Sequence, residues 1–186
     1  MKTYEEMVAL FEKANDRFLS KNIDILTRDI SERTLCGALM LEIYEIIREN
    51  SDYEGYYVDV EYNRNIGHID DRKRTSEEVN KNINCDLILH SRGKIAEQDN
   101  LIALEMKKSN RPPSEKRDDK KRLRSLTRIP KNINEFKSDL PEFVCGYQLG
   151  IYYEINYKKD SIALIFYRDG IESDKDCIFL ENYRSN

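Results

Sequence analysis

Two charged residues, Glu105 and Lys107, stand at the end of an apolar run that begins at Leu101. In a strand alternate side chains share a face, so Glu105 and Lys107 are neighbours on one face of a predicted strand at residues 100–107. Removing an unpaired charge from water costs free energy, so this pair must be solvated or engaged by a ligand. The alternative is an exposed ion pair on an edge strand, which would contribute little to stability.

Asp86 lies in a second predicted strand, residues 83–90, which a polar connection joins to the strand at 100–107. Asp86 and Glu105 are equidistant from the middle of this hairpin, so antiparallel pairing brings the two carboxylates side by side. Without a cation they repel and the pKa of one rises; with Mg²⁺ their oxygens become hard ligands. The pair therefore predicts a metal site. Lys107 would there hold the attacking water or stabilise negative charge in the transition state.

A helix predicted from residue 31 to about residue 50 supplies a third carboxylate. Its N-cap is Asp29 or Ser31. Its apolar stripe consists of Leu35, Leu39, Ile43, Ile46 and Ile47. At about 100° per residue Glu32 lies at the centre of that stripe, so its side chain points inward. Glu32 is a candidate for a further oxygen ligand.

The remaining elements follow from periodicity and breaker residues. We predict helices at residues 4–19 and 114–127, the second capped by Ser114 and ended by Pro130, and strands at residues 56–62, 144–155, 161–167 and 177–180. The polar stretch at residues 63–82 has no periodicity and is long enough to be a functional loop or arm. The order of elements around the hairpin is thus helix, three strands, helix, strand.

Asp86, the triplet Glu105-Met106-Lys107 and this element order resemble the PD-(D/E)XK nuclease superfamily over residues 31–155. Segments 58–64, 85–90 and 100–108 look like a group of small bacterial and phage members of it. One position departs from the pattern, since Cys85 stands where the family often has proline. An isolated E-x-K triplet carries little weight, but here spacing, strand context, the helix glutamate and a neighbouring basic segment agree.

The resemblance implies an α/β fold with a restriction-endonuclease-like αβββαβ core, a mixed sheet flanked by helices, and extra C-terminal strands. It implies Asp86, Glu105 and Glu32 as ligands of Mg²⁺ or Mn²⁺, and Lys107 as the catalytic lysine. The expected activity is metal-dependent hydrolysis of nucleic-acid phosphodiesters, with DNA as the expected substrate. The alternative is a catalytically inactive nucleic-acid-binding or protein-interaction module on the same fold.

A basic segment follows the predicted active-site strand. The whole chain has a formal net charge of -4, yet residues 107–131 hold eleven Lys or Arg against three acidic residues. This indicates a phosphate-facing patch. Its candidate contacts are Lys108, Arg111, Arg117, Lys120, Lys121 and Arg124. The alternative is a solvated helix face with ion pairs between successive turns.

Other polar residues admit both a functional and a structural interpretation. His90, four residues after Asp86, either lines the site or makes a hydrogen bond at a strand end, and His68 is expected to be solvated. Glu61 and Arg64 either position substrate or pair with each other. Gln148 either reaches the site or is a polar residue at a strand edge.

Composition indicates a globular intracellular protein, which we expect in the cytoplasm. The chain has 39% hydrophobic and 35% charged residues. It contains no apolar run long enough for a membrane span and no signal-peptide pattern. Its four cysteines are widely spaced and are expected to be reduced. We predict one domain, with a helical appendage at 1–28, the core at 31–155 and additional strands at 156–186; a homodimer would be the simple way to cut two strands.

Overall fold

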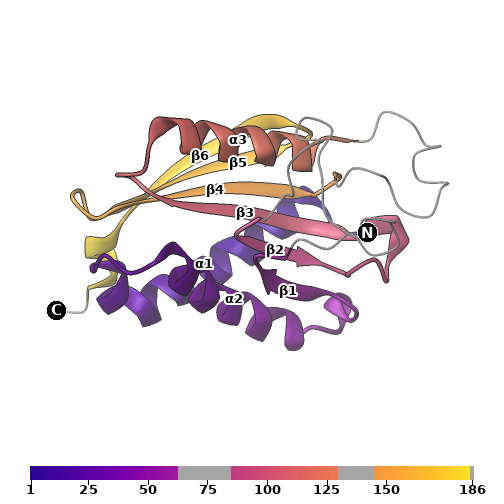
Figure 1. Cartoon of the computed structure of the whole chain (residues 1–186). Coiled ribbons are helices and arrows are strands. Elements are labelled where there is room, and N and C mark those ends of the chain that lie inside the picture. Colours follow the sequence, from indigo (N-terminus) through magenta and orange to yellow (C-terminus); the bar gives the residue numbers. More distant parts are fainter. Residues whose placement is uncertain (63–84, 130–144, 185–186) are drawn as a thin grey trace.

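The computed structural model describes residues 1–62, 85–129 and 145–184. These residues form an α/β fold with helices on both faces of one sheet (Figure 1). The helices are α1 (Tyr4–Leu26), α2 (Glu32–Arg48) and α3 (Pro113–Thr127), and the strands are β1 (Tyr57–Val60), β2 (Leu87–His90), β3 (Asn100–Lys108), β4 (Leu149–Asn156), β5 (Ser161–Arg168) and β6 (Ile171–Phe179). No helix within the described residues has the length and apolar character of a membrane span.

The sheet has six strands in the order β1-β2-β3-β4-β5-β6. Only β3 and β4 run parallel, and the other neighbours are antiparallel. Parallel neighbours need a crossover connection, and α3 lies between β3 and β4 in the sequence. Figure 1 shows α3 on one face of the sheet and α1 and α2 on the other.

The two faces of β3 belong to two separate apolar clusters. Leu104 and Met106 pack in the large cluster that includes α1 and α2. Ala103 packs in the small cluster, with Leu123 and Leu126 of α3. Because side chains alternate along a strand, Glu105 lies on the α3 face. The candidate chemistry therefore sits between the sheet and the crossover helix.

The first residues of α2 and α3 show how the local sequence sets where a helix begins. Ser31 caps α2, since its hydroxyl accepts a hydrogen bond from the Thr34 amide at 3.1 Å. The predicted cap at Ser114 is wrong: α3 begins at Pro113, and Pro112 precedes it without a side-chain cap. Proline is favoured in the first helical turn because its missing N–H has no intrahelical partner there.

Several other boundaries differ from the prediction. Strand β2 begins at Leu87, so Asp86, which was predicted to lie within a strand at 83–90, immediately precedes it. Helix α1 continues to Leu26 through a kink at Asn22, whose side-chain amide donates to the Phe18 carbonyl. Strand β4 begins at Leu149, within the strand predicted at 144–155. Strand β6 begins at Ile171, well before the predicted residue 177. The prediction missed its charged first half because these residues lie exposed on an edge strand and show no apolar alternation. The polar stretch 63–82 and Pro130 lie outside the described residues.

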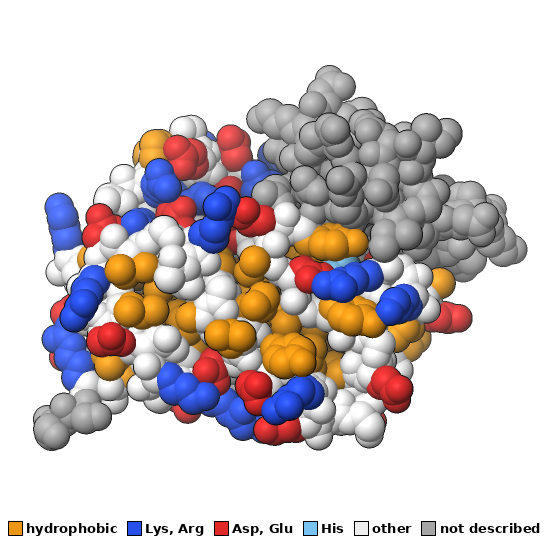
Figure 2. All heavy atoms as spheres, turned by 60° about the horizontal axis from the view of Figure 1, so that its bottom comes forward, with side chains coloured by type: hydrophobic (Ala, Val, Ile, Leu, Met, Phe, Trp, Pro, Cys, Tyr) orange, Lys and Arg blue, Asp and Glu red, His pale blue; other side chains and the backbone are white. Residues whose placement is uncertain are grey.

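Figure 2 shows the side of the molecule that carries α1 and α2, where basic and acidic side chains are interspersed around scattered apolar ones. The largest exposed apolar side chains of α2 are Leu41 and Tyr44. This face shows no concentration of one charge sign. Its character contrasts with the basic outer side of α3.

Candidate active site

The strand register places Asp86 beside Glu105. Leu87 pairs with Leu104 and Ile88 with Ala103, so one further step of the same register brings Asp86 opposite Glu105. The Asp86 carboxylate also accepts a hydrogen bond from the Met106 amide at 2.8 Å. The structure therefore agrees with the predicted hairpin geometry of the two carboxylates.

Both carboxyl groups lie in a poorly solvated environment. The Glu105 side chain is only 1% exposed. Burial and the neighbouring Asp86 raise the pKa of Glu105 well above its usual range, although Arg122 acts in the opposite direction. Burial also raises the pKa of Asp86, against the influence of Lys107 and the Met106 amide. Such a pair favours the uptake of a proton or of a cation.

Lys107 contacts an acidic partner that sequence analysis did not single out. Its ammonium lies 3.2 Å from Oδ2 of Asp119 in α3, and Asp119 is buried. Burial acts to lower the pKa of Lys107, but Asp86 and Asp119 outweigh it and the pKa lies above its usual value. Lys107 is therefore a fixed positive charge beside Asp86.

Arg122 completes the ion network between α3 and β3. Its Nη1 lies 2.7 Å from Glu105 Oε1 and 3.1 Å from Asp119 Oδ1. In the sequence alone, Asp119 and Arg122 were only two of the charges of the basic segment. A signal was present, because Asp119, Leu123 and Leu126 fall at helical spacing on one face, which marks Asp119 as inward-facing.

Glu32 approaches from α2, at the end of β3. Its Oε1 accepts hydrogen bonds from the Lys108 amide at 2.9 Å and from Arg111 Nε at 3.2 Å. Burial acts to raise the pKa of Glu32, but Arg111 and the Lys108 amide prevail, so the pKa is lowered. Glu32 is thus an ionised carboxylate that is already occupied by an arginine.

A pocket of about 290 Å³ gives access to part of this site. It is lined by Ser31, Glu32, Arg33, Cys36, Val60, Glu61, Asp86 and Arg111. The pocket brings Glu32 and Asp86 together, whereas Glu105 is not part of its wall. Glu61 has a positive φ of 51° and donates its backbone N–H to the Asp86 carbonyl at 3.3 Å.

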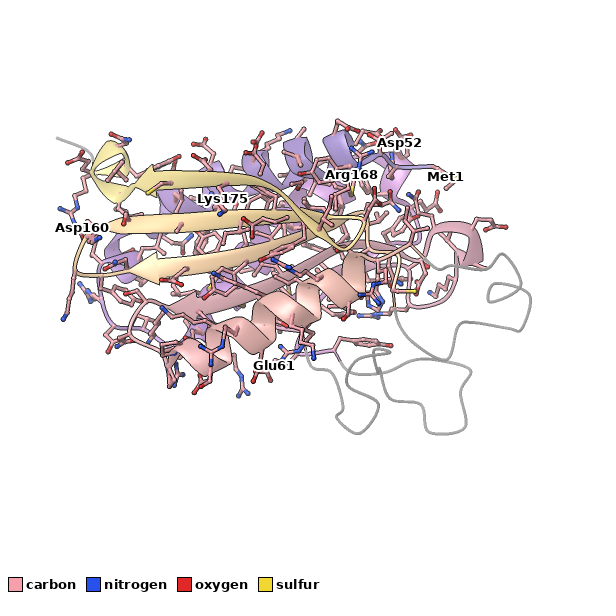
Figure 3. All side chains as sticks on the ribbon, turned by 90° about the horizontal axis from the view of Figure 1, so that it is seen from above. Met1, Asp52, Glu61, Asp160, Arg168 and Lys175 are labelled. Atoms are coloured by element: carbon pink, nitrogen blue, oxygen red, sulfur yellow. The ribbon has the colours of Figure 1, made fainter. Side chains whose placement is uncertain are left out.

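Figure 3 views the molecule from the α3 side. Helix α3 lies across part of the sheet, and in this view most of β5 and β6 lies to one side of the helix whereas the labelled Glu61 lies to the other. Since β1 and β6 form opposite edges of the sheet, the pocket lies at the β1 edge.

The six candidate phosphate contacts do not form one uniform surface. Lys108 pairs with Asp29 at 2.6 Å and Arg111 with Glu32, whereas the Lys120 ammonium lies over the Tyr152 ring. Arg117, Lys121, Arg124 and Arg128 are exposed at spacings of four, three and four residues, and Arg124 also lies 3.8 Å from Glu172. Because such spacing follows one helix face, Arg117, Lys121 and Arg124 form an outer basic stripe on α3, and Arg128 is the C-cap residue that follows the helix.

The remaining candidates have structural partners. His90 is buried and its Nε2 lies 3.0 Å from Asp59 Oδ2, which supports the strand-end interpretation. Glu61 pairs with Arg33, and the Gln148 side chain donates to the Gly146 carbonyl at 3.4 Å. Arg64 and His68 lie outside the described residues, as does Lys131 of the basic segment.

Two observations show how far these residues suit a divalent metal ion. Asp86 and Glu105 offer adjacent carboxylates of raised pKa, a donor chemistry that suits a hard divalent cation. Among residues 1–62, 85–129 and 145–184, however, no group of three or more His, Cys, Asp or Glu side chains is arranged to hold a metal ion. Arg122 and Arg111 instead occupy oxygens of Glu105 and Glu32. The donor types fit a metal, whereas three-carboxylate ligation that includes Glu32 is not formed.

No protein-family model, curated protein or solved structure matches this chain.

Proposed function

We propose that this protein is a metal-dependent nuclease that hydrolyses phosphodiester bonds of nucleic acid, with DNA as the expected substrate. The observation that carries the proposal is the contact of Asp86, which immediately precedes β2, with Glu105 of β3, together with the Lys107 ammonium beside them. The succession α2, β1, β2, β3, α3 and β4 supports the resemblance to the PD-(D/E)XK superfamily and its αβββαβ core.

Asp86 and Glu105 would hold Mg²⁺ or Mn²⁺, and Glu32 is a further candidate ligand. The bound ion would supply Lewis-acid chemistry and a water of lowered pKa. Glu105 must exchange its contact with Arg122 to take part, since Arg122 now engages Oε1 at 2.7 Å. The Met106 amide holds the Asp86 carboxylate in place.

Lys107 would provide the positive charge that stabilises the pentacovalent phosphate and orients the attacking water. Asp119 fixes the position of this ammonium through the contact at 3.2 Å. A side chain that is already oriented needs no reorganisation when charge develops in the transition state. The ion network thus gives Lys107 a defined geometry.

Incubation of the protein with plasmid DNA and with RNA tests the proposal directly. We expect cleavage in Mg²⁺ or Mn²⁺ and none in chelator. Cleavage that persists in chelator, or no cleavage of either polymer with any divalent ion, would contradict the proposal.

Asp86→Ala should abolish the heat of Mg²⁺ binding in a calorimetric titration. The substitution removes one of the two adjacent carboxylates, so the remaining site loses a hard anionic ligand. Asp118→Ala is the matched control, because Asp118 is an exposed aspartate of α3 outside the ion network. Equal Mg²⁺ heats for the two variants would rule out Asp86 as a ligand.

Reversing charges on the outer basic stripe should weaken nucleic-acid binding. In the triple variant Arg117→Glu, Lys121→Glu and Arg124→Glu, the slope of log affinity against log salt should flatten by about one unit per lost phosphate contact. The control triple, Lys13→Glu, Lys158→Glu and Lys159→Glu, makes the same charge change at exposed positions elsewhere. If both triples bind alike, the stripe is only a solvated helix face.

One observation favours the alternative of an inactive nucleic-acid-binding or protein-interaction module. Lys107 and Arg122 already form ion pairs with two of the buried carboxylates, Asp119 and Glu105. A protein that binds nucleic acid through the outer basic stripe but neither takes up Mg²⁺ nor cleaves would fit this alternative.

A further inference from the structure

The pocket beside Asp86 has two arginines in its wall. Arg33 is the second residue of α2, and Arg111 precedes α3, so they come from separate segments. With a volume of about 290 Å³ the pocket lies at the lower end of the range of ligand pockets, about 300 to 1,000 Å³. It therefore suits one small group of a larger ligand.

The guanidinium group of each arginine donates two hydrogen bonds to one carboxylate. Arg33 donates Nε and Nη2 to the two oxygens of Glu61 at 2.7 and 2.8 Å. Arg111 donates in the same way to Glu32 at 3.2 and 3.3 Å. A guanidinium fork that binds a carboxylate in this manner also matches two oxygens of a phosphate.

The two ion pairs differ in what an exchange of partners costs. Arg33 and Glu61 are 73% and 37% exposed, and an exposed ion pair of this kind contributes little to stability. Arg111 is 48% exposed but Glu32 only 14%, so Glu32 keeps the Lys108 amide and needs a cation in place of Arg111 when Arg111 turns to phosphate. The pocket also adjoins the N-terminal end of α2, where the helix dipole favours an anion. The pocket thus combines two exchangeable guanidinium groups with the Asp86 carboxylate.

We propose that Arg33 and Arg111 bind a backbone phosphate of the nucleic-acid strand that enters this pocket, and so place that strand next to Asp86. This inference rests on the proposed function and deepens it, since it assigns phosphate recognition to a pocket that contains no residue of α3. Glu32, Glu61 and Asp86 line the same pocket and repel phosphate. Binding there accordingly depends on a divalent cation that offsets their charge.

The test measures binding separately from cleavage. Fluorescence anisotropy of a short labelled DNA single strand is recorded in Mg²⁺ and in chelator, on a Lys107→Met background so that the probe stays intact. Arg33→Gln and Arg111→Gln should each weaken binding in Mg²⁺ by about tenfold, the scale of one charge-assisted contact. Each should also lower the salt slope by about one unit. Inorganic phosphate should compete with the probe on the parent protein.

Arg48→Gln is the matched control. Arg48 lies at the other end of α2, is 59% exposed and pairs with Glu45 at 3.0 Å, so it has the same kind of surface ion pair away from the pocket. Its variant should bind the probe like the parent. If the glutamine variants do not fold, Arg33→Lys and Arg111→Lys replace them in the test. These variants keep the charge but lose the guanidinium fork, so each should lose less affinity than the tenfold expected for glutamine.

The outcomes separate this inference from the proposed function. Cleavage of plasmid by the unmodified protein, together with equal affinity of the double glutamine variant and Arg48→Gln, would overturn the inference alone. If the probe binds in an arginine-dependent way but the protein cleaves nothing in any divalent ion, the inference is supported and the proposed nuclease activity is contradicted. Failure of the parent to bind the probe in Mg²⁺ would also overturn it.

Discussion

Lys107→Met should reduce the cleavage rate by about 10² or more while leaving the fold and Mg²⁺ binding intact. The substitution keeps the aliphatic length and removes only the charge, and loss of one preorganised electrostatic group costs on this scale. Asp119 keeps a partner in this variant, because Arg122 lies 3.1 Å from its Oδ1. The measurement is a single-turnover rate on plasmid, with Mg²⁺ heat and thermal unfolding recorded in parallel.

Lys116→Met is the matched control for this experiment. Lys116 pairs with Glu154 at 3.1 Å with 18% of its side chain exposed, close to the 3.2 Å and 14% of Lys107 with Asp119. A rate for Lys107→Met equal to that of Lys116→Met would show that Lys107 has no catalytic part. Loss of folding in Lys107→Met alone would mean that its main task is to neutralise Asp119 and Asp86.

Arg122→Met should lower the free energy of unfolding by about 3 to 5 kcal/mol, because it leaves Glu105 and Asp119 as buried carboxylates with one cation fewer. Glu105 is 1% exposed and Asp119 6%, so water cannot replace the guanidinium. Chemical denaturation measures the change. Arg117→Met, at an exposed position of the same helix, should shift the value by no more than about 0.5 kcal/mol.

The same variant should lose stability with rising pH over a wider pH range than the parent protein does. Glu105 already has a folded-state pKa well above its usual range, mainly because it is buried. Removal of Arg122 raises that pKa further, so the folded state binds a proton more tightly than the unfolded state does. The free energy of unfolding then falls as pH rises from the unfolded carboxyl pKa, about 4.3, to the raised value.

A second substitution isolates the role of Glu105 in this effect. Glu105→Gln in the Arg122→Met background removes the carboxylate and should recover a large part of the lost stability. It should also flatten the pH dependence. If the double variant is no more stable than Arg122→Met, Arg122 stabilises the fold through packing and not through its charge.

The sequence determined by itself the features that depend on chain neighbours. The apolar stripe of α2 follows from a helical period, and Ser31 follows from the need for an N-cap. The alternation of β3 places Glu105 and Lys107 on one face. These features need no knowledge of packing. The position of the hairpin also indicates that Asp86 lies close to Glu105, but the exact register depends on a shift between Leu89 and His90 that the sequence does not show.

The tertiary structure decided how the charged groups are satisfied. Asp119 and Arg122 meet Lys107 and Glu105 only because the crossover helix α3 packs on that face of β3. Arg33 and Arg111 meet at one pocket because α2 begins beside the end of β3, where the Glu32 carboxylate accepts the Lys108 amide. Ion-pair partners that lie far apart in the sequence leave no periodic trace, since each charge alone also suits a solvated surface. The sequence therefore identified the carboxylates and the lysine, whereas the fold selected their counter-ions and placed two guanidinium groups beside Asp86.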